Sequence, residues 1–318
     1  MAEFGRTADG QRVDRITLRA GGLQVAVLTW GAVLQSVRLE GVSHDLTLGS
    51  EDLTGYEGAL CYHGSIIAPV VNRLTNAAAP LGGKMLKFEV NFNGAHVLHS
   101  GLAGTQTKVW QVVQVNDSAC TLALDLPDGE GGFPGNRHVE AKFEVAAPAR
   151  LRLTITVHSD AATIWNAANH SYWNLDGSAD FAGHVLTLAA DHYLPATPEF
   201  IPTGEIRDVA GLFDFRKDRA VSPGNPDLDN CFCLSPAATD LRDVMNLRGQ
   251  TGVEMTLATT EPGLQLYDCR HDGYKGLAVE AQGWPDAPNK PGFPGIALAA
   301  GETRAQITEW RFAKCRLQ

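Results

Sequence analysis

The sequence predicts an all-β protein, a large β-sandwich formed as a single domain over residues 1–318. Hydrophobic residues mostly alternate with polar ones at a period of two, which is the period of strands. The 33 glycines and 16 prolines gather at the breaks between these segments, as turn chemistry requires. The chain shows no alternation of strands with long helices, and many strands without an evident domain boundary favour a sandwich closed by loops.

The expected elements follow in chain order. Within 152–158, Leu153, Ile155 and Val157 share one face of a strand, while threonines occupy the other face. Trp310 and Phe312 alternate with charged residues in the last strand in the same way. Two short helices are expected, one from Glu51 to Glu57 and one from Leu241 to Leu247 after an Asp240 cap. The remaining strand-like segments are 23–29, 109–115, 138–145 and 253–259.

Composition restricts the partners of the chain. The formal net charge is −10, and no basic stripe is visible, which argues against a nucleic-acid partner and against an anionic membrane surface. The acidic balance suits a small neutral or cationic ligand. The N-terminus lacks the apolar core of a signal peptide, and no run of about 18 apolar residues is present. We therefore expect a cytoplasmic protein without a membrane segment.

The six cysteines are too scattered for a disulfide scaffold and are expected to be reduced. Cys231-Phe232-Cys233 has half of a metal-ligand spacing, but no second pair follows it. The pattern therefore predicts neither a metal nor a nucleotide cofactor.

Two segments place an arginine and a histidine where a ligand could reach them. Asn72 and Arg73 interrupt an apolar stretch, and arginine offers a rigid fork of donors that suits hydroxyl oxygens or a developing oxyanion. His99 follows Val97-Leu98 on a turn. The alternative readings are an exposed arginine at a strand end and a histidine with a structural role.

Two further segments combine polar and aromatic groups. In Asn169–Leu175, His170 and Tyr172 are expected on one face of a strand, and aromatic faces with polar tips suit a pyranose ring. Asp229 begins another expected strand, where its carboxylate could accept from hydroxyls. An aromatic core cluster and an ordinary turn are the respective alternatives.

Glu280 is the least ordinary residue of the chain. It lies in the middle of the apolar strand Gly276–Gln282. A buried carboxylate without partners costs several kcal/mol, so it requires a satisfying network or a chemical task. Burial would also raise its pKa toward neutrality, which favours a general base.

These segments, in their order and spacing, resemble the aldose 1-epimerase (galactose mutarotase) family from about Ile16 to Phe312. The matching stretches are Asn72–Leu74, Leu98–Gly101, Asp128–Asn136, Asn169–Leu175, Ile201–Glu205, Phe213–Arg216, Asp229-Asn230, Gly263–Tyr267, Leu277–Gln282 and Pro285–Asn289.

The resemblance implies a single-domain supersandwich that interconverts the α and β anomers of a free aldose without a cofactor. The protein is expected to be a monomer or a homodimer. It implies Glu280 as the proton acceptor and His170 as the proton donor. The positions matching those that hold the sugar or assist at its ring oxygen are Asn72, Arg73, His99, Tyr172, Asp229 and Gln265.

The sequence departs from the family pattern in places that bear on which sugar fits. Ala68-Pro69 stands where many members have Gly-Arg, Ser100 replaces a common glycine, and Asp268–His271 replaces the usual Thr-Gly-Asn. Two other functions remain open: an epimerase of hexose 6-phosphates, which would need a cluster of cations, and a carbohydrate-binding protein without catalysis.

Overall fold

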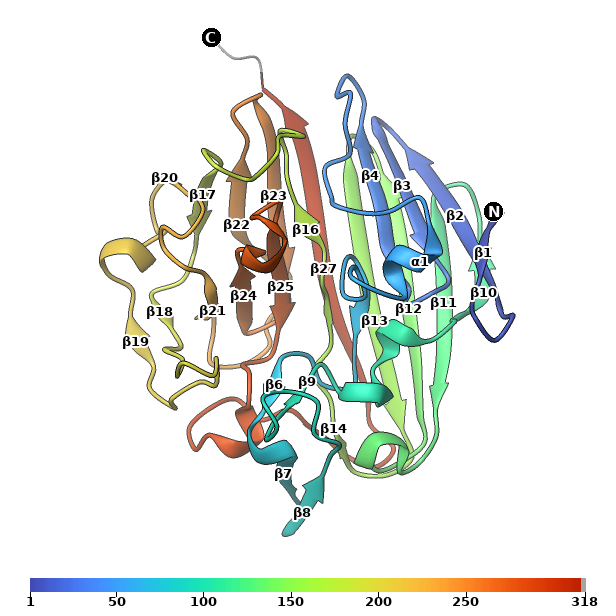
Figure 1. The fold of residues 1–318 in the computed structure, drawn as a ribbon, viewed down its shortest axis with the longest axis vertical. Coiled ribbons are helices and arrows are strands. Elements are labelled where there is room, and N and C mark those ends of the chain that lie inside the picture. The colour runs from blue at the N-terminus through green and yellow to red at the C-terminus, as the bar shows by residue number, and fades with distance from the viewer. Residues whose placement is uncertain (316–318) are drawn as a thin grey trace.

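A long antiparallel sheet forms the back layer of the molecule (Figure 1). The structure is a computed structural model that describes residues 1–315. In spatial order, the strands of this sheet are β10 (Gln111–Val115), β11 (Ala119–Leu126), β12 (Arg137–Ala146), β13 (Arg150–Ser159), β27 (Thr303–Lys314), β23 (Val253–Thr259), β22 (Arg242–Arg248), β17 (Val185–Leu188) and β20 (Arg219–Ala220).

Two smaller sheets cover this layer. Strands β1 (Ala2–Arg6), β2 (Arg12–Ala20), β3 (Leu23–Leu28) and β4 (Leu34–Leu39) form one of them, and β2 and β3 pack against β11 and β12. The other contains, in order, β16 (Tyr172–Trp173), β25 (Leu277–Gln282), β24 (Gly263–Tyr267), β21 (Asp229–Cys233), β18 (His192–Tyr193) and β19 (Arg207–Asp208). Figure 1 shows this second sheet in front of β27, β23 and β22.

Large aromatic side chains join the layers. Trp173 of β16 contacts Trp310 and Phe312 of β27, with ring centroids 5.9 and 5.6 Å apart. Leu266 and Val279 belong to the same buried cluster. Because side chains alternate along a strand, the opposite face of the second sheet is left free for polar residues.

The remaining elements are short. The paired strands are β5 (Ile66–Ile67) with β15 (Ala168–Asn169), β6 (Arg73–Leu74) with β9 (Val97–Leu98), β7 (Ala78–Leu81) with β8 (Lys84–Lys87), and β14 (Thr163–Ile164) with β26 (Ala297–Leu298). The helical turns are α1 (Leu53–Tyr56), η1 (Thr75–Ala77), η2 (Gly101–Ala103), η3 (Thr105–Thr107), η4 (Glu130–Gly132), η5 (Gly211–Phe213), η6 (Arg270–Asp272) and η7 (Ala287–Asn289). Within residues 1–315, no helix is long and apolar enough to cross a membrane.

The all-β prediction is confirmed, and each expected strand except the one at Asn169–Leu175 lies on a single observed strand. The helix expected at 51–57 is the single turn α1. The helix expected from Leu241 to Leu247 is wrong, because this segment is β22, paired with β17 and β23. The register with β23 shifts between Asp243 and Met245, so Val244 and Met245 are both buried. Such a bulge gives consecutive inward residues and produces the spacing of a helix within a strand.

Candidate active site

The free face of the second sheet supplies one wall of the site. Glu280 of β25 lies directly opposite Gln265 of β24, and Gln265 lies opposite Cys231 of β21. Cross-strand neighbours project to the same side of a sheet. Since Val279 and Leu266, the neighbours of this pair along each strand, belong to the core, Glu280 and Gln265 project away from it. Strand alternation therefore explains how a carboxylate comes to lie mid-strand.

The hairpin of β6 and β9 supplies a second wall. Arg73 pairs with Leu98, which brings Asn72 beside His99. The amide of His99 donates to the carbonyl of Asn72 at 2.9 Å, and the amide of Asn72 donates to Nδ1 of His99 at 3.1 Å. Because Nδ1 accepts, the ring proton of neutral His99 is on Nε2. Burial also lowers the pKa of His99 well below its usual value, so the ring is neutral.

His170 lies between two strands rather than within the strand expected there, since β15 ends at Asn169 and β16 begins at Tyr172. Its backbone amide donates to the carbonyl of Ser65 at 2.9 Å. Its ring packs beside Tyr172, with centroids 5.0 Å apart, and stacks on Tyr62 at 5.9 Å. The aromatic rings therefore restrict the orientation of the imidazole.

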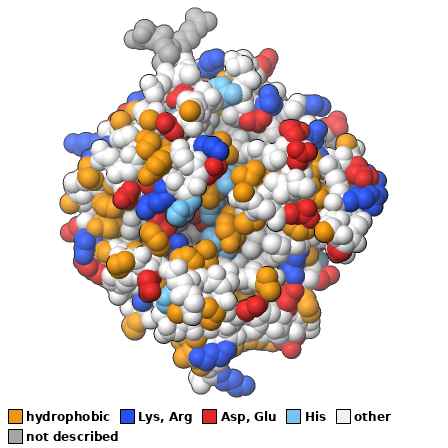
Figure 2. Space-filling view, in the orientation of Figure 1, with side chains coloured by type: hydrophobic (Ala, Val, Ile, Leu, Met, Phe, Trp, Pro, Cys, Tyr) orange, Lys and Arg blue, Asp and Glu red, His pale blue; other side chains and the backbone are white. Residues whose placement is uncertain are grey.

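These walls enclose a cavity of about 550 Å³. Figure 2 shows histidine side chains in and beside a hollow near the middle of this face, with hydrophobic side chains around it. The cavity volume lies within the range usual for small-molecule sites. Seven of the eight residues singled out from the sequence line the cavity: Asn72, Arg73, His99, His170, Tyr172, Asp229 and Glu280.

Gln265 is the exception. Its amide donates to Oδ1 of Asp229 at 2.7 Å, and it lines a small neighbouring recess instead of the main cavity. In this structure it holds the Asp229 carboxylate in position.

Glu280 and His170 meet at the base of the cavity. Oε1 of Glu280 lies 3.5 Å from Nε2 of His170, and both side chains are nearly fully buried. Within the described part of the chain, Oε2 of Glu280 and Nδ1 of His170 have no hydrogen-bond partner. Buried polar atoms seldom stay unpaired, so these two are available to a ligand.

The same burial shifts both pKa values away from the charged forms. Burial raises the pKa of Glu280 well above its usual value, and the nearby charge of Asp229 raises it further. Burial lowers the pKa of His170 to about 3, with the nearby His63 adding to the effect. At a pH between these two pKa values the pair holds one proton, which is on Glu280.

Arg73 and Asp229 form an ion pair on the opposite side. Nη2 of Arg73 lies 3.2 Å from Oδ2 of Asp229, and both side chains are about nine-tenths buried. The guanidinium lies between two aromatic rings, 4.8 Å from the centroid of Phe92 and 5.1 Å from that of Phe200. This arrangement fixes donors and an acceptor beside apolar faces, which suits a ligand with alternating hydroxyl and C–H surfaces.

Of the segments that depart from the family pattern, Asp268–His271 borders the cavity, whereas Ala68, Pro69 and Ser100 do not line it. Asp268 is fully buried and accepts from Nε of Arg270 at 2.9 Å. It also accepts from the amide of Leu228 at 3.1 Å, so it ties the η6 turn to the start of β21. Arg270 and His271 line the cavity. Any effect of this departure on sugar choice would therefore act through the cavity wall that these residues form.

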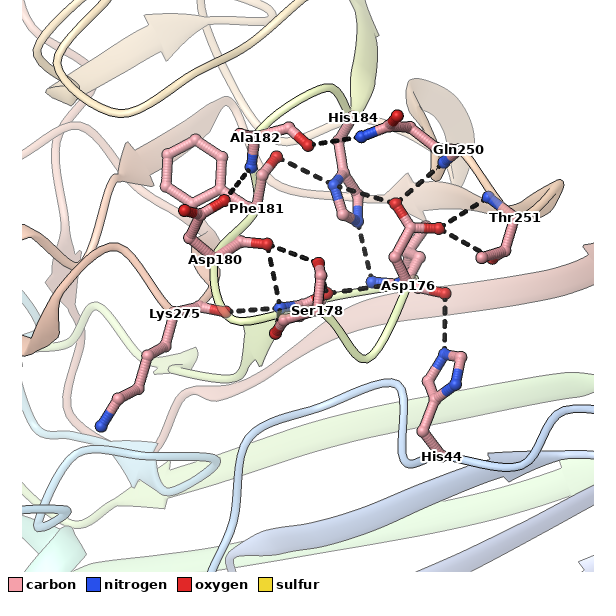
Figure 3. A network of polar contacts seen from close by, with 12 residues as sticks. His44, Asp176, Ser178, Asp180, Phe181, Ala182, His184, Gln250, Thr251 and Lys275 are labelled. Atoms are coloured by element: carbon pink, nitrogen blue, oxygen red, sulfur yellow. Dashed lines mark hydrogen bonds and ion pairs between the residues drawn. The ribbon is translucent and has the colours of Figure 1, made fainter.

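A polar network fixes the neighbouring loops (Figure 3). The Asn174 amide donates to the carbonyls of Lys275 at 2.8 Å and Ser178 at 2.9 Å. His184 accepts the amide of Leu175 through Nε2 at 2.9 Å. These bonds hold the segment that follows Tyr172 against the loop that carries Lys275.

Several cavity residues were not predicted from the sequence. Most belong to loops without a recognisable spacing, although Tyr267 ends β24. These residues are Tyr62, His63, Phe92, Phe200 and Tyr267, and their rings provide much of the apolar lining. The aromatic character of Phe92 and Phe200, close to other site segments, was the available signal.

Comparisons with known proteins agree with this geometry. The family model described as aldose 1-epimerase matches residues 14–311. Galactose mutarotase from Bos taurus is 30% identical, with 95% of this chain and 94% of the relative covered. Aldose 1-epimerase from Escherichia coli is 29% identical, with 96% of each chain covered.

Solved structures show the same architecture. An aldose epimerase homologue from C. elegans superimposes with a TM-score of 0.88 at 26% identity, with 96% of this chain and 100% of that chain covered. Galactose 1-epimerase from Lactobacillus acidophilus gives 0.87 at 26% identity, with 99% and 98% covered. The chain belongs to the aldose 1-epimerase family.

Proposed function

We propose that this protein is an aldose 1-epimerase, which interconverts the α and β anomers of a free aldose such as galactose or glucose. The observation that carries the proposal is the buried Glu280–His170 pair, whose facing atoms lie 3.5 Å apart at the base of a cavity of about 550 Å³. Two relatives that align with nearly the whole chain are named galactose mutarotase and aldose 1-epimerase, which supports the same reaction.

The reaction requires two proton transfers. The Glu280 carboxylate removes the proton from the anomeric hydroxyl while the His170 imidazolium protonates the ring oxygen, so the C1–O5 bond breaks and an open-chain aldehyde forms. Rotation about C1–C2 presents the other aldehyde face. The ring oxygen then attacks C1 and returns its proton to His170, while the new anomeric oxygen takes a proton from Glu280. Protons and charge balance over the cycle, and each positioned transfer contributes about 10²–10⁴-fold.

The active form differs from the resting form only in the position of one proton. Moving it from Glu280 to His170 creates a carboxylate and an imidazolium, which burial disfavours. The shift of the His170 pKa from 6.5 to about 3 corresponds to about 5 kcal/mol against the imidazolium. Attraction between unit charges at 3.5 Å offsets about 5 kcal/mol at an effective dielectric constant of 20. The attraction between the two charges thus offsets the free-energy cost of the buried imidazolium. The cost of the buried carboxylate has to be offset by hydrogen bonds from the sugar hydroxyls.

The other site residues hold the sugar in our proposal. Arg73 and Asp229 present a donor and an acceptor to the hydroxyls, and Gln265 keeps Asp229 oriented. Asn72 holds His99 so that Nε2–H is its donor. Tyr172 offers an apolar face beside His170. The chemistry needs no metal or cofactor, because all of the protons come from side chains and the sugar.

The two alternative functions are not favoured. A phosphorylated sugar would need free cations, but three cations near the cavity are already paired: Arg73 with Asp229, Arg270 with Asp268 and Lys275 with Asp272. A binding protein without catalysis would not need an unpaired carboxyl oxygen beside an imidazole.

We also propose that the protein works in the cytoplasm on a small monosaccharide, as a monomer or homodimer. The six cysteines carry no disulfide, which is consistent with a reducing compartment. The direct test is polarimetry on freshly dissolved α-galactose and α-glucose. Substoichiometric protein should speed the decay of optical rotation in proportion to its concentration, and decay at the rate of buffer alone would refute the function.

A further inference from the structure

Three potential metal ligands meet in the wall of the cavity. One ligand atom from each of His63, Cys269 and Asp272 lies within 4.8 Å of the other two. His63 and Cys269 are buried, and all three residues line the cavity that holds the Glu280–His170 pair. The proposed sugar chemistry uses none of them.

His63 is the second, independent observation. Its side chain is 5% exposed, and neither ring nitrogen has a hydrogen-bond partner among residues 1–315. The ring stacks on Tyr172 with centroids 4.1 Å apart, which fixes its plane without satisfying its nitrogens. An unmade hydrogen bond of a buried polar group costs about 1–3 kcal/mol, so a partner that the protein does not supply would stabilise this ring.

Cys269 occupies a backbone conformation that favours glycine. Its φ of 55° is in the left-handed region, and the residue is 2% exposed. A side chain at such a position costs on the order of 1–2 kcal/mol relative to glycine. The thiol therefore occupies this position at a backbone cost.

From these observations we propose that His63, Cys269 and Asp272 form a transition-metal site of the zinc type, with its fourth position open toward the cavity. Zinc accepts one nitrogen, one sulfur and one oxygen ligand, and thiolate with imidazole selects it over magnesium or calcium. On binding, the Cys269 thiol releases its proton to solvent, so one thiolate and one carboxylate balance the charge of the dication.

The ligands need only small movements. In a tetrahedral zinc site with the usual bond lengths, ligand atoms lie roughly 3.5 Å apart. The atoms of the cluster lie within 4.8 Å, and two of the three residues belong to or adjoin the short turn η6 (Arg270–Asp272). Lys275 donates to Oδ1 of Asp272 at 2.8 Å, which leaves Oδ2 for the metal. Removing this cation should tighten metal binding, on the order of threefold to tenfold.

The site would link two loops that line the cavity. His63 follows α1, and Cys269 and Asp272 follow β24, so a bound ion would hold these loops together across Tyr172. We therefore expect the metal to hinder sugar entry. The binding part of the proposal is independent of the proposed function.

Cobalt(II) titration of the full chain, followed by absorption, tests the site. We expect one ion per chain, with a thiolate-to-cobalt charge-transfer band that zinc abolishes by displacement. The Cys269→Gly variant relieves the positive φ, so it should fold at least as well while the band disappears. Its affinity should fall at least about 100-fold, because loss of an outer-shell group alone costs 10–100-fold. Asp272→Asn should weaken binding as well.

Two other cysteines provide matched controls. Cys61 is near His63 in the chain and Cys315 is exposed, and the Cys61→Ala and Cys315→Ala variants should keep the band. A folded parent protein without the band would overturn the site. A band that survives in Cys269→Gly, or that disappears in either control, would overturn the ligand assignment.

The effect on sugar entry has a separate readout. One equivalent of Zn²⁺ should raise the KM of the parent protein and leave that of Cys269→Gly unchanged. Equal inhibition of both proteins would refute the link between this site and sugar entry. A folded protein that binds cobalt but has no epimerase activity would refute the proposed function and leave the metal site standing.

Discussion

Replacing Glu280 with glutamine separates the chemical role of the carboxylate from its structural role. Glutamine keeps the shape of the side chain and an oxygen that can accept from the sugar, but it cannot take the anomeric proton. The variant should therefore bind sugar and fail to open the ring efficiently.

The substitution should slow the reaction without lowering the stability of the fold at neutral pH. Loss of a general base should slow the reaction about 10²–10⁴-fold, equivalent to about 3–5 kcal/mol in the barrier. Burial raises the folded-state pKa of Glu280 above 4.5, so the folded protein binds more protons than the unfolded chain above that pH. The parent therefore loses stability as the pH rises from 4.5 toward the raised pKa of Glu280. Glu280→Gln has no carboxyl group at this position, so it lacks this pH-dependent loss. At neutral pH the slower enzyme should be as stable as the parent or more stable.

Polarimetry with fresh α-galactose gives the rate, and thermal unfolding at pH 5 and 8 gives the stability. Glu261 offers a matched control, because burial raises the pKa of its carboxyl too, although it does not line the cavity. Glu261→Gln should keep the parent rate. A Glu280→Gln protein that folds and equilibrates sugar at the parent rate would refute the assignment of the base.

Three further outcomes follow from the charges in the site. In a profile of rate against pH, the rate should fall on the alkaline side, where the Glu280–His170 pair loses its proton. Burial of His170 places the fall on the acidic side well below pH 6.5. A flat rate up to about pH 9, or an acidic fall centred at pH 6.5, would contradict this. Asp229→Asn should raise KM about tenfold, because the sugar loses a charged hydrogen bond. It should also move the alkaline fall in rate to lower pH, because the charge of Asp229 raises the Glu280 pKa, and an unmoved fall would argue against that coupling. The unfolded chain binds a proton at His170 below pH 6.5 and the folded protein only near pH 3, so acidification should remove up to about 5 kcal/mol of stability. His170→Asn should flatten this dependence in denaturant titrations, and an unchanged slope would show that other groups cause it.

Most of the fold could be predicted because the strands that bury one face carry a period of two. The prediction was wrong at Leu241–Leu247, where a bulge in β22 puts Val244 and Met245 inside together. A seven-residue segment with that spacing fits a helix equally well, and only the neighbouring strands β17 and β23 decide the outcome. Pairing between distant segments is not visible in a local pattern.

The part of the site that lies on strands could be predicted from the same local patterns. Glu280 was visible as a carboxylate in an apolar strand, and seven of the eight expected residues line one cavity. Phe200 and His63 were missed, because they lie on loops whose positions depend on tertiary packing. The His63–Cys269–Asp272 cluster joins segments about 200 positions apart, far from the short spacings that identify zinc sites in sequences.

The central claim is that Glu280 and His170 act as one proton-sharing pair, and a double-mutant cycle on the rate of mutarotation tests it most directly. Groups that act as a unit are not additive when removed. We expect Glu280→Gln combined with His170→Asn to be about as slow as the slower of the two single variants. If the double variant instead loses the product of the two single effects, the residues act independently and the claim is contradicted.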